Sequence, residues 1–208
     1  MYLDFSTLNA RTAYYWLAST VTPRPVAWVS SLSADGVANL APFSFFQVVT
    51  HTPPTLMICP LVNSDGSMKD TAANIAATGE FVVNLVPHTL VQQMNQTSFG
   101  YDRATSEWER AGLAGLPSSK VKPQRVSGVP VSFECRRVSV TPYPADAPSC
   151  YIILGEVVAA HIDEAIVGTN QQIDPMALDL VSRMGADWYG RTRSEANFEL
   201  TRPEGWAR

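Results

Sequence analysis

The chain has 208 residues, of which 46% are hydrophobic and 16% are charged, and its formal net charge is −4. A chain of this size and composition can bury a core of its own, so we expect a single domain over residues 1–208. The acidic balance, together with the lack of any run of five like charges, argues against a nucleic-acid partner or binding to an anionic membrane surface.

The sequence gives no sign of export, membrane insertion or metal binding. Residues 1–10 lack a basic start and a long apolar stretch, and no window approaches 18 uninterrupted apolar residues, so we expect a cytoplasmic protein. The cysteines, Cys59, Cys135 and Cys150, are odd in number and far from zinc-ligand spacing. We expect neither a disulfide framework nor a metal site, and we interpret each cysteine as a small buried hydrophobic residue.

The first predicted elements form a β-meander. Residues 26–32 are rich in β-branched and aromatic side chains, residues 33–36 supply a turn, and extended character resumes over residues 37–46. Two prolines after Thr52 interrupt the chain before a third short apolar strand over residues 55–59. Three sequential strands with short links are therefore expected.

The hairpin could hold a flat ligand. Because side chains alternate along a strand, Trp28 lies on one face and Val29 on the other. Polar Asn39 and Ser44 stand among apolar and aromatic neighbours, a mixture that can hydrogen-bond the edge of a ring while packing its apolar part. A well-packed hairpin with incidental polar residues explains the same pattern.

A helix is predicted after the third strand. Ser67 is followed three residues later by Asp70, which resembles a capping box, and the helix should run through Ala77 and end at Gly79. The first turn of a helix carries free backbone N–H groups and a partial positive charge. Lys69 in that turn makes a candidate anion site, although a solvated lysine is an equally simple interpretation.

The remainder of the chain indicates a barrel. A fourth strand is predicted over residues 81–85, a short helix after Pro87, and two long strands over residues 131–141 and 151–162. A looser stretch covers residues 99–130. About six strands against three short helices predict a mainly β fold, a six-stranded barrel with peripheral helices, whose core covers about residues 20–165.

The C-terminal segment, residues 166–208, is predicted to be a tail. Its part over residues 183–193 is rich in arginine, aromatic residues and glycine, so it could cover a site, contact a neighbouring subunit or dock on its own barrel.

Neither a phosphate-binding glycine loop nor a hydrolase nucleophile motif is present. We interpret His161 as a surface histidine or one with its hydrogen bonds satisfied.

These segments, taken in order, resemble the flavin reductase-like, FMN-binding split-barrel family, in its flavoredoxin-like branch. The resemblance spans roughly residues 20–200 and is carried by Pro23–Ser30, Asn39–Phe46, Lys69–Thr71, Gly79–Leu85, Gly155–Val158, Asp174–Pro175 and Arg183–Tyr189. It implies a homodimer of six-stranded split barrels with FMN bound near the subunit interface.

The resemblance also implies the cofactor contacts. The expected neighbours of the ring and ribityl chain are Ser30, Ser31, Asn39, Ala41, Phe43, Ser44 and Phe45. The expected phosphate contacts are Ser67, Lys69, Thr71 and Asp70, the last through its N–H group. Arg24 is expected to approach the flavin, and Tyr189 and Arg191 to lie over it or over the partner chain.

Three functions are consistent with this resemblance. The first is an NAD(P)H-dependent flavin reductase that transfers hydride from NADH or NADPH to FMN and feeds a monooxygenase or another acceptor. The second is a flavoredoxin-like electron carrier with tightly bound FMN. The third is a non-catalytic split-barrel module that binds another ligand or none. The flavin carries the redox chemistry itself, so no catalytic side chain is assigned.

Overall fold

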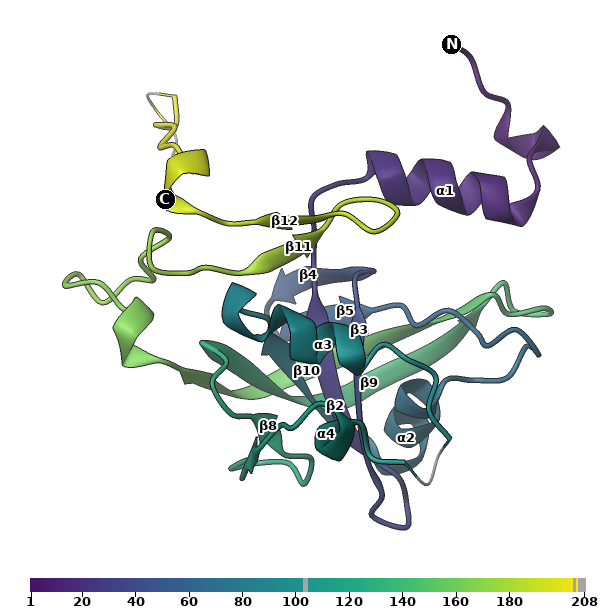
Figure 1. Ribbon diagram of the computed structural model, residues 1–208, viewed down its shortest axis with the longest axis horizontal. Helices are drawn as coiled ribbons and strands as arrows, with labels where there is room; N and C mark the ends of the chain where they lie inside the picture. The colour runs from purple at the N-terminus through teal and green to yellow at the C-terminus, as the bar shows by residue number, and fades with distance from the viewer. Residues whose placement is uncertain (103–104, 204, 206–208) are drawn as a thin grey trace.

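The computed structural model describes residues 1–102, 105–203 and 205 (Figure 1). Its helices are α1 (Ala10–Thr20), α2 (Asp70–Thr78), α3 (Val91–Gln96) and α4 (Glu107–Arg110), with 3-10 turns η1 (Phe5–Thr7), η2 (His88–Leu90), η3 (Glu164–Ile166) and η4 (Ser194–Ala196). Its strands are β1 (Arg24–Pro25), β2 (Ala27–Leu32), β3 (Ala38–Phe43), β4 (Phe46–His51), β5 (Pro54–Ile58), β6 (Glu80–Leu85), β7 (Gly115–Leu116), β8 (Arg125–Val126), β9 (Val131–Tyr143), β10 (Cys150–Ile162), β11 (Val181–Arg183) and β12 (Tyr189–Arg191).

The main sheet has its two edge strands joined by a very short link. Its order is β3-β2-β6-β9-β10-β5-β4, so β3 and β4 form opposite edges. Only Ser44 and Phe45 separate the end of β3 from the start of β4. The sheet must therefore curl until its edges approach each other, although β3 and β4 form no ladder. The result is a split barrel.

Strand alternation divides the hydrophobic residues into two clusters. Ala27 and Val29 of β2 pack in a cluster that includes Ile75 of α2 and Phe81 of β6. Trp28, between them in sequence, faces the other cluster, which is formed with α3, α4 and the stretch before β9. Trp28 is fully buried, and its indole N–H donates to the Thr97 hydroxyl at 2.8 Å. The two faces predicted for the hairpin thus contact different hydrophobic clusters, with Ala27 and Val29 in one and Trp28 in the other.

The N-terminal helix and the C-terminal hairpin meet at one end of the barrel. β11 pairs with both β12 and β1, forming a small three-stranded sheet, and Figure 1 shows it at the same end as α1. A Cβ at Gly185, in the β11–β12 turn, would lie 2.8 Å from the Cα of Ser19. Only glycine allows this close approach between the turn and α1.

Buried Arg24 joins these parts. Its guanidinium donates to the carbonyls of Ala18 and Val21 at the end of α1, at 2.5 and 2.6 Å, and to the carbonyl of Met184 at 3.2 Å. The tail thus packs on its own barrel through residues 181–191. Residues 204 and 206–208 of the predicted tail lie outside the described residues.

The predicted fold class is confirmed, with differences in detail. The sheet has seven strands because residues 37–46, expected as one strand, break at Ser44 and continue as β4. β4 exposes Val48 and Val49 and so lacks the alternation that predicts a half-buried strand. Helix α1 was not predicted from the sequence. Residues 103–104 of the predicted loose stretch lie outside the described part of the chain.

Two other sequence interpretations need correction. The helix begins at Asp70 with Lys69 as N-cap, and Ser67 does not cap it. Ser67 instead donates its N–H and hydroxyl to the Asp65 carboxylate, because a local turn competes for the same groups. Of the three free cysteines, only Cys135 is buried; Cys59 and Cys150 are partly exposed.

The described residues contain no helix that is both long and apolar enough to cross a membrane.

A fully buried carboxylate fixes the chain before β9. Glu134 accepts hydrogen bonds from the N–H groups of Ser119, Lys120 and Val121, at 2.7, 2.5 and 3.1 Å. His161 Nε2 lies 2.6 Å from its Oε1, so the histidine has its hydrogen bond satisfied, as expected. Burial opposes ionisation, but the backbone and histidine hydrogen bonds prevail and lower the pKa of Glu134.

We expect Glu134→Gln to lower the free energy of unfolding at pH 7 by about 1–3 kcal/mol, because an amide cannot accept all these bonds. The folded-state pKa lies below the unfolded one, so the carboxylate stabilises the fold above the unfolded pKa. That contribution disappears as the pH falls through the folded-state value. Urea denaturation at pH 7 and pH 4 measures both effects. Glu156→Gln, on the exposed side of β10, is the control; equal losses for the two variants would contradict the assignment.

Candidate functional site

A pocket of about 350 Å³ opens where β3 approaches the start of α2. One wall is β3, which contributes Asn39, Ala41, Pro42 and Phe43. The second wall is the loop and helix start that carry Asn63, Lys69, Asp70 and Thr71. The third wall comes from the stretch after α3 and from α4, with Thr97, Ser98, Phe99, Gly100, Tyr101 and Glu107. The volume falls within the usual range for small-molecule pockets.

The α2 wall presents an N-terminus with no side-chain cap. Lys69 is the N-cap residue, and no side-chain hydrogen bond caps the helix. The exposed ammonium group of Lys69 donates to Asn63 Oδ1 at 3.2 Å, which draws it towards the loop side of the pocket. Backbone N–H groups at such an end are available to a ligand, and the helix dipole favours a negative charge.

Buried polar contacts set the spacing between the first two walls. Asn39 Nδ2 donates to the Thr71 hydroxyl at 2.8 Å, which ties β3 to the first turn of α2. Asn74 Nδ2, one turn further along, donates to the Ser31 hydroxyl of β2 at 3.2 Å. All four side chains are at least nine-tenths buried. These hydrogen bonds are sheltered from water, so they hold the helix start in register with the sheet.

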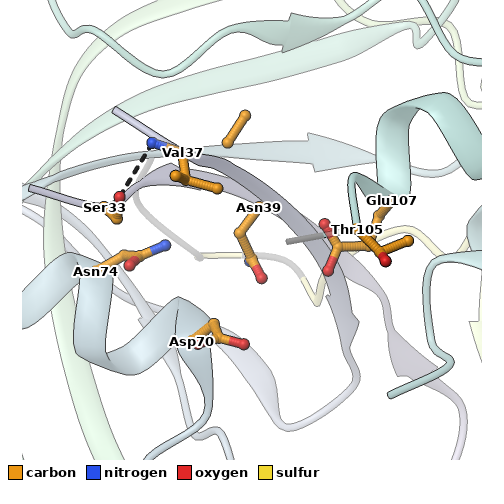
Figure 2. Close-up of a pocket in the computed structure, with 8 residues that line it drawn as sticks. Ser33, Val37, Asn39, Asp70, Asn74, Thr105 and Glu107 are labelled. Atoms are coloured by element: carbon orange, nitrogen blue, oxygen red, sulfur yellow. Dashed lines mark hydrogen bonds between the residues drawn. The ribbon is translucent and has the colours of Figure 1, made fainter. Parts of the chain in front are cut away.

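A small hollow beside the pocket is lined by two carboxylates, those of Asp70 and Glu107. Figure 2 shows Asp70 and Asn74 on α2, Asn39 between the elements, and Glu107 on the opposite side. Glu107 also accepts a hydrogen bond from the N–H of Leu40 at 3.4 Å. Burial raises the pKa of Glu107, and the nearby Asp70 carboxylate adds to the increase, against the opposing hydrogen bonds. The walls therefore carry two acids beside one lysine.

A second hollow, of about 310 Å³, adjoins the first pocket. The two share Pro42, Phe43 and Ser98 in their walls. The second hollow extends past Ser44 to the C-terminal hairpin, where Arg183, Asp187 and Tyr189 line it. Phe43 thus lies between a space bounded by the α2 N-terminus and a space bounded by the hairpin.

The structure brings together part of the predicted site. Asn39, Ala41, Phe43, Lys69, Asp70 and Thr71 line the first pocket, and Phe43, Ser44 and Tyr189 line the second hollow. The other predicted residues, namely Arg24, Ser30, Ser31, Phe45, Ser67 and Arg191, line neither space.

Each of these exceptions is engaged elsewhere. Ser30 donates to the carbonyl of Gln124, so the segment before β9 covers it, and Ser31 accepts from Asn39 and Asn74. Phe45 packs near Arg24, whose guanidinium carbon lies 5.8 Å from the ring centroid. Arg191 forms an ion pair with Asp179. Arg24 and Ser67 make the contacts already described.

Sequence reasoning missed the third wall. Residues 97–101 fall partly in the stretch interpreted as loose, yet Phe99 and Tyr101 bring aromatic side chains to the pocket. The rings of these two residues lie 4.9 Å apart between centroids. A glycine between two aromatic residues is the signal that could have pointed to a binding loop here. Glu107 carried no such signal.

Comparison with known proteins identifies the family. A family model described as the flavin reductase like domain matches residues 19–178. The chain belongs to the flavin reductase-like family. The family predicted from the sequence is therefore confirmed.

Several solved structures share the fold of this chain. Nitrilotriacetate monooxygenase component B from Bacillus cereus is 29% identical, with a TM-score of 0.90 over 96% of this chain and 98% of that one. The 2-nitrobenzoate 2-nitroreductase NbaA of Pseudomonas fluorescens is 26% identical, with a TM-score of 0.88 over 100% and 99% of the two chains. Flavoredoxin of Desulfovibrio vulgaris, at 14% identity, matches the fold with a TM-score of 0.75 over 99% and 98%.

The raised pKa of Glu107 gives a stability prediction for this flavin reductase-like protein. Between the unfolded and folded pKa values the folded state binds more protons, so wild-type stability falls as the pH rises through that window. We expect Glu107→Gln to remove this fall. Compared with the difference in stability between the two proteins at pH 4, the variant should therefore gain on wild type at pH values above the folded-state pKa. Denaturant unfolding from pH 4 to pH 8 measures it.

The matched control is Glu109→Gln on the same helix, where the side chain is exposed. This variant should follow the wild-type pH profile. A Glu107→Gln profile parallel to that of wild type would show that burial of the carboxyl has no energetic consequence.

Proposed function

We propose that the protein binds FMN in the first pocket and acts as an NAD(P)H-dependent flavin reductase. The observation that carries this proposal is the juxtaposition of the apolar β3 wall with the uncapped N-terminus of α2. FMN has the matching parts, a flat ring system at one end and a phosphate at the other. Membership of the flavin reductase-like family supports the choice of a flavin.

The α2 end of the pocket fits a phosphate. The N–H groups of Asp70 and Thr71 would donate to it, and Lys69 would supply a charge-assisted contact. The Asp70 carboxylate opposes a phosphate, so Asp70 contributes through its backbone. Glu107 also opposes it when ionised, and its raised pKa reduces that repulsion as the pH falls.

The β3 side of the pocket fits the ring and ribityl chain. Ala41, Pro42 and Phe43 offer apolar surface, and the aromatic rings of Phe99 and Tyr101 face the same space. Asn39 is held by Thr71 and lies between the two ends of the pocket, where a ribityl hydroxyl would pass.

Bound FMN would supply the electron-transfer chemistry, accepting a hydride and passing electrons on. The chain would bind it, orient it and exclude water from one face. No side chain of the pocket is required as a proton donor or acceptor, and none is assigned a catalytic role.

The proposal includes partners. Likeness to a protein described as component B of a monooxygenase supports an oxygenase as the consumer of the reduced flavin. A homodimer is supported by α1, which exposes the large apolar side chains of Tyr14, Tyr15 and Leu17. Tyr14 lies beside Phe45, with ring centroids 6.2 Å apart, so this face is continuous with the link between β3 and β4.

The visible spectrum tests the function. We expect the purified protein, after incubation with FMN, to show the absorbance of bound flavin, and anaerobic mixing with NADH or NADPH to bleach it. A flavoredoxin-like carrier would bind flavin without being bleached by either nucleotide. A protein that retains no flavin absorbance after gel filtration, and reduces no added FMN, would be neither.

A substitution tests the phosphate end. Lys69→Ala should weaken FMN binding about tenfold or more while leaving riboflavin, which has no phosphate, nearly unaffected. Quenching of flavin fluorescence gives both affinities. The control is Lys122→Ala, an exposed lysine outside the pocket. Equal losses for FMN and riboflavin would exclude Lys69 as a phosphate contact.

A further inference from the structure

Three side chains form a row across the small sheet at the end of the barrel. Arg24 of β1 pairs directly with Arg183 of β11, and Arg183 pairs with Tyr189 of β12. Directly opposed residues of antiparallel strands project from the same face. The guanidinium carbon of Arg183 lies 4.6 Å from the centroid of the Tyr189 ring, a cation–π contact.

This row places two like charges side by side without an ion-pair partner. Arg24 donates to three carbonyls and to the Ser44 hydroxyl, and Arg183 donates to the carbonyl of Ala186. Within the described part of the chain, neither guanidinium forms a salt bridge with a carboxylate. Burial, together with the charge of Arg183, lowers the pKa of Arg24. Opposed like charges are destabilising in a sheet, so the arrangement favours an added anion.

Two of the three side chains of this row, those of Arg183 and Tyr189, face the second hollow. Arg183 and Tyr189 line this space and also the smaller continuation of it beside α3, where Gln92 and Asn95 form the other side. Asp187, an exposed acid, lines both spaces as well. Phe43 lines both this hollow and the first pocket. A ligand in the hollow would therefore lie next to a flavin ring that packs against β3 in the first pocket.

We propose that the second hollow binds the pyrophosphate-bearing part of the electron donor, with Arg183 as its principal anion contact. The inference rests on the proposed function, since it assigns the donor of that reaction to a site. Arg183 is half-buried and its guanidinium is held flat on Tyr189, which presents its planar N–H groups to a phosphate with little loss of side-chain entropy. Arg24 adds a fixed positive charge behind it and keeps the hairpin in place.

This assignment replaces Arg191 by Arg183 as the arginine of the tail that contacts a ligand. The guanidinium of Arg191 is paired with the Asp179 carboxylate, and hydrogen bonding from Arg191 lowers the pKa of that carboxyl. Arg183 lies on the neighbouring strand and retains N–H groups for a ligand, because its one described acceptor is a carbonyl.

The direct test is a binding titration with ADP-ribose, which carries the pyrophosphate and adenosine of the donor but cannot transfer a hydride. Isothermal titration calorimetry on the flavin-loaded full chain should show binding to wild type. We expect affinity about tenfold or more lower for Arg183→Gln and partly restored for Arg183→Lys. Adenosine, which lacks phosphate, should bind both proteins alike. Arg193→Gln, an exposed arginine of the same tail, is the matched control.

Kinetics provides a second measurement. With NADH or NADPH as donor, Arg183→Gln should raise KM about tenfold while kcat changes less than twofold, and the affinity for FMN should stay at the wild-type value. A drop in FMN affinity of the same size would assign Arg183 to the first pocket instead and overturn the inference.

The two proposals fail in different ways. If ADP-ribose does not bind wild type, or binds Arg183→Gln equally well, the anion site is wrong even if NADH bleaches the flavin. If ADP-ribose binding depends on Arg183 but neither nucleotide bleaches the flavin, the anion site stands and the reductase function is wrong.

Discussion

The link of two residues between β3 and β4 is the constraint on which the rest of the structure depends. It joins opposite edges of a seven-stranded sheet, so the sheet cannot lie flat. The same link brings Phe43 and Ser44 to the seam of the barrel, where both hollows meet. The site is therefore a consequence of closure. β3 has a free edge because no ladder joins it to β4, and the free edge leaves room for a ligand between the strand and the α2 N-terminus.

Closure alone does not position the walls; buried polar contacts do. Asn39 and Thr71 join strand to helix, and Trp28 donates to Thr97 at the start of the third wall. Glu134 holds the segment that covers the outer face of β2. In each case a polar group from one element is buried against another, and leaving it unpaired would cost more than the bond contributes. Such pairs therefore fix the relative position of the two elements, because a shifted position would leave the buried polar groups unpaired.

The sequence predicts local features well and non-local ones poorly. The hairpin faces, the long strands and the termination of α2 at Gly79 follow from neighbouring residues, and Gly79 does adopt a left-handed conformation with φ of 75°. Asn39, Lys69 and Thr71 stand in segments that belong to an ordered family pattern, and all three line the first pocket. Ser67 was misread because Asp65, two residues away, competes for its donors. No local pattern places Glu107 and Arg183 at the walls of these spaces, because the elements they face are distant in sequence. Arg191 illustrates the same limit, because nothing local distinguishes it from Arg183.

The contacts of Arg24 connect helix α1 with the C-terminal hairpin of β11 and β12. One guanidinium bonds the last turn of α1 and the turn of the C-terminal hairpin, and Gly185 lets that turn touch Ser19. The hairpin in turn forms the outer wall of the second hollow. Residues 18–21 therefore support a wall built by residues 183–189, whereas the hydrophobic cluster that contains Ala27 and Val29 includes no residue of α1 or of the hairpin. A change confined to α1 would therefore reach the wall of the second hollow through Arg24 before it reached that cluster.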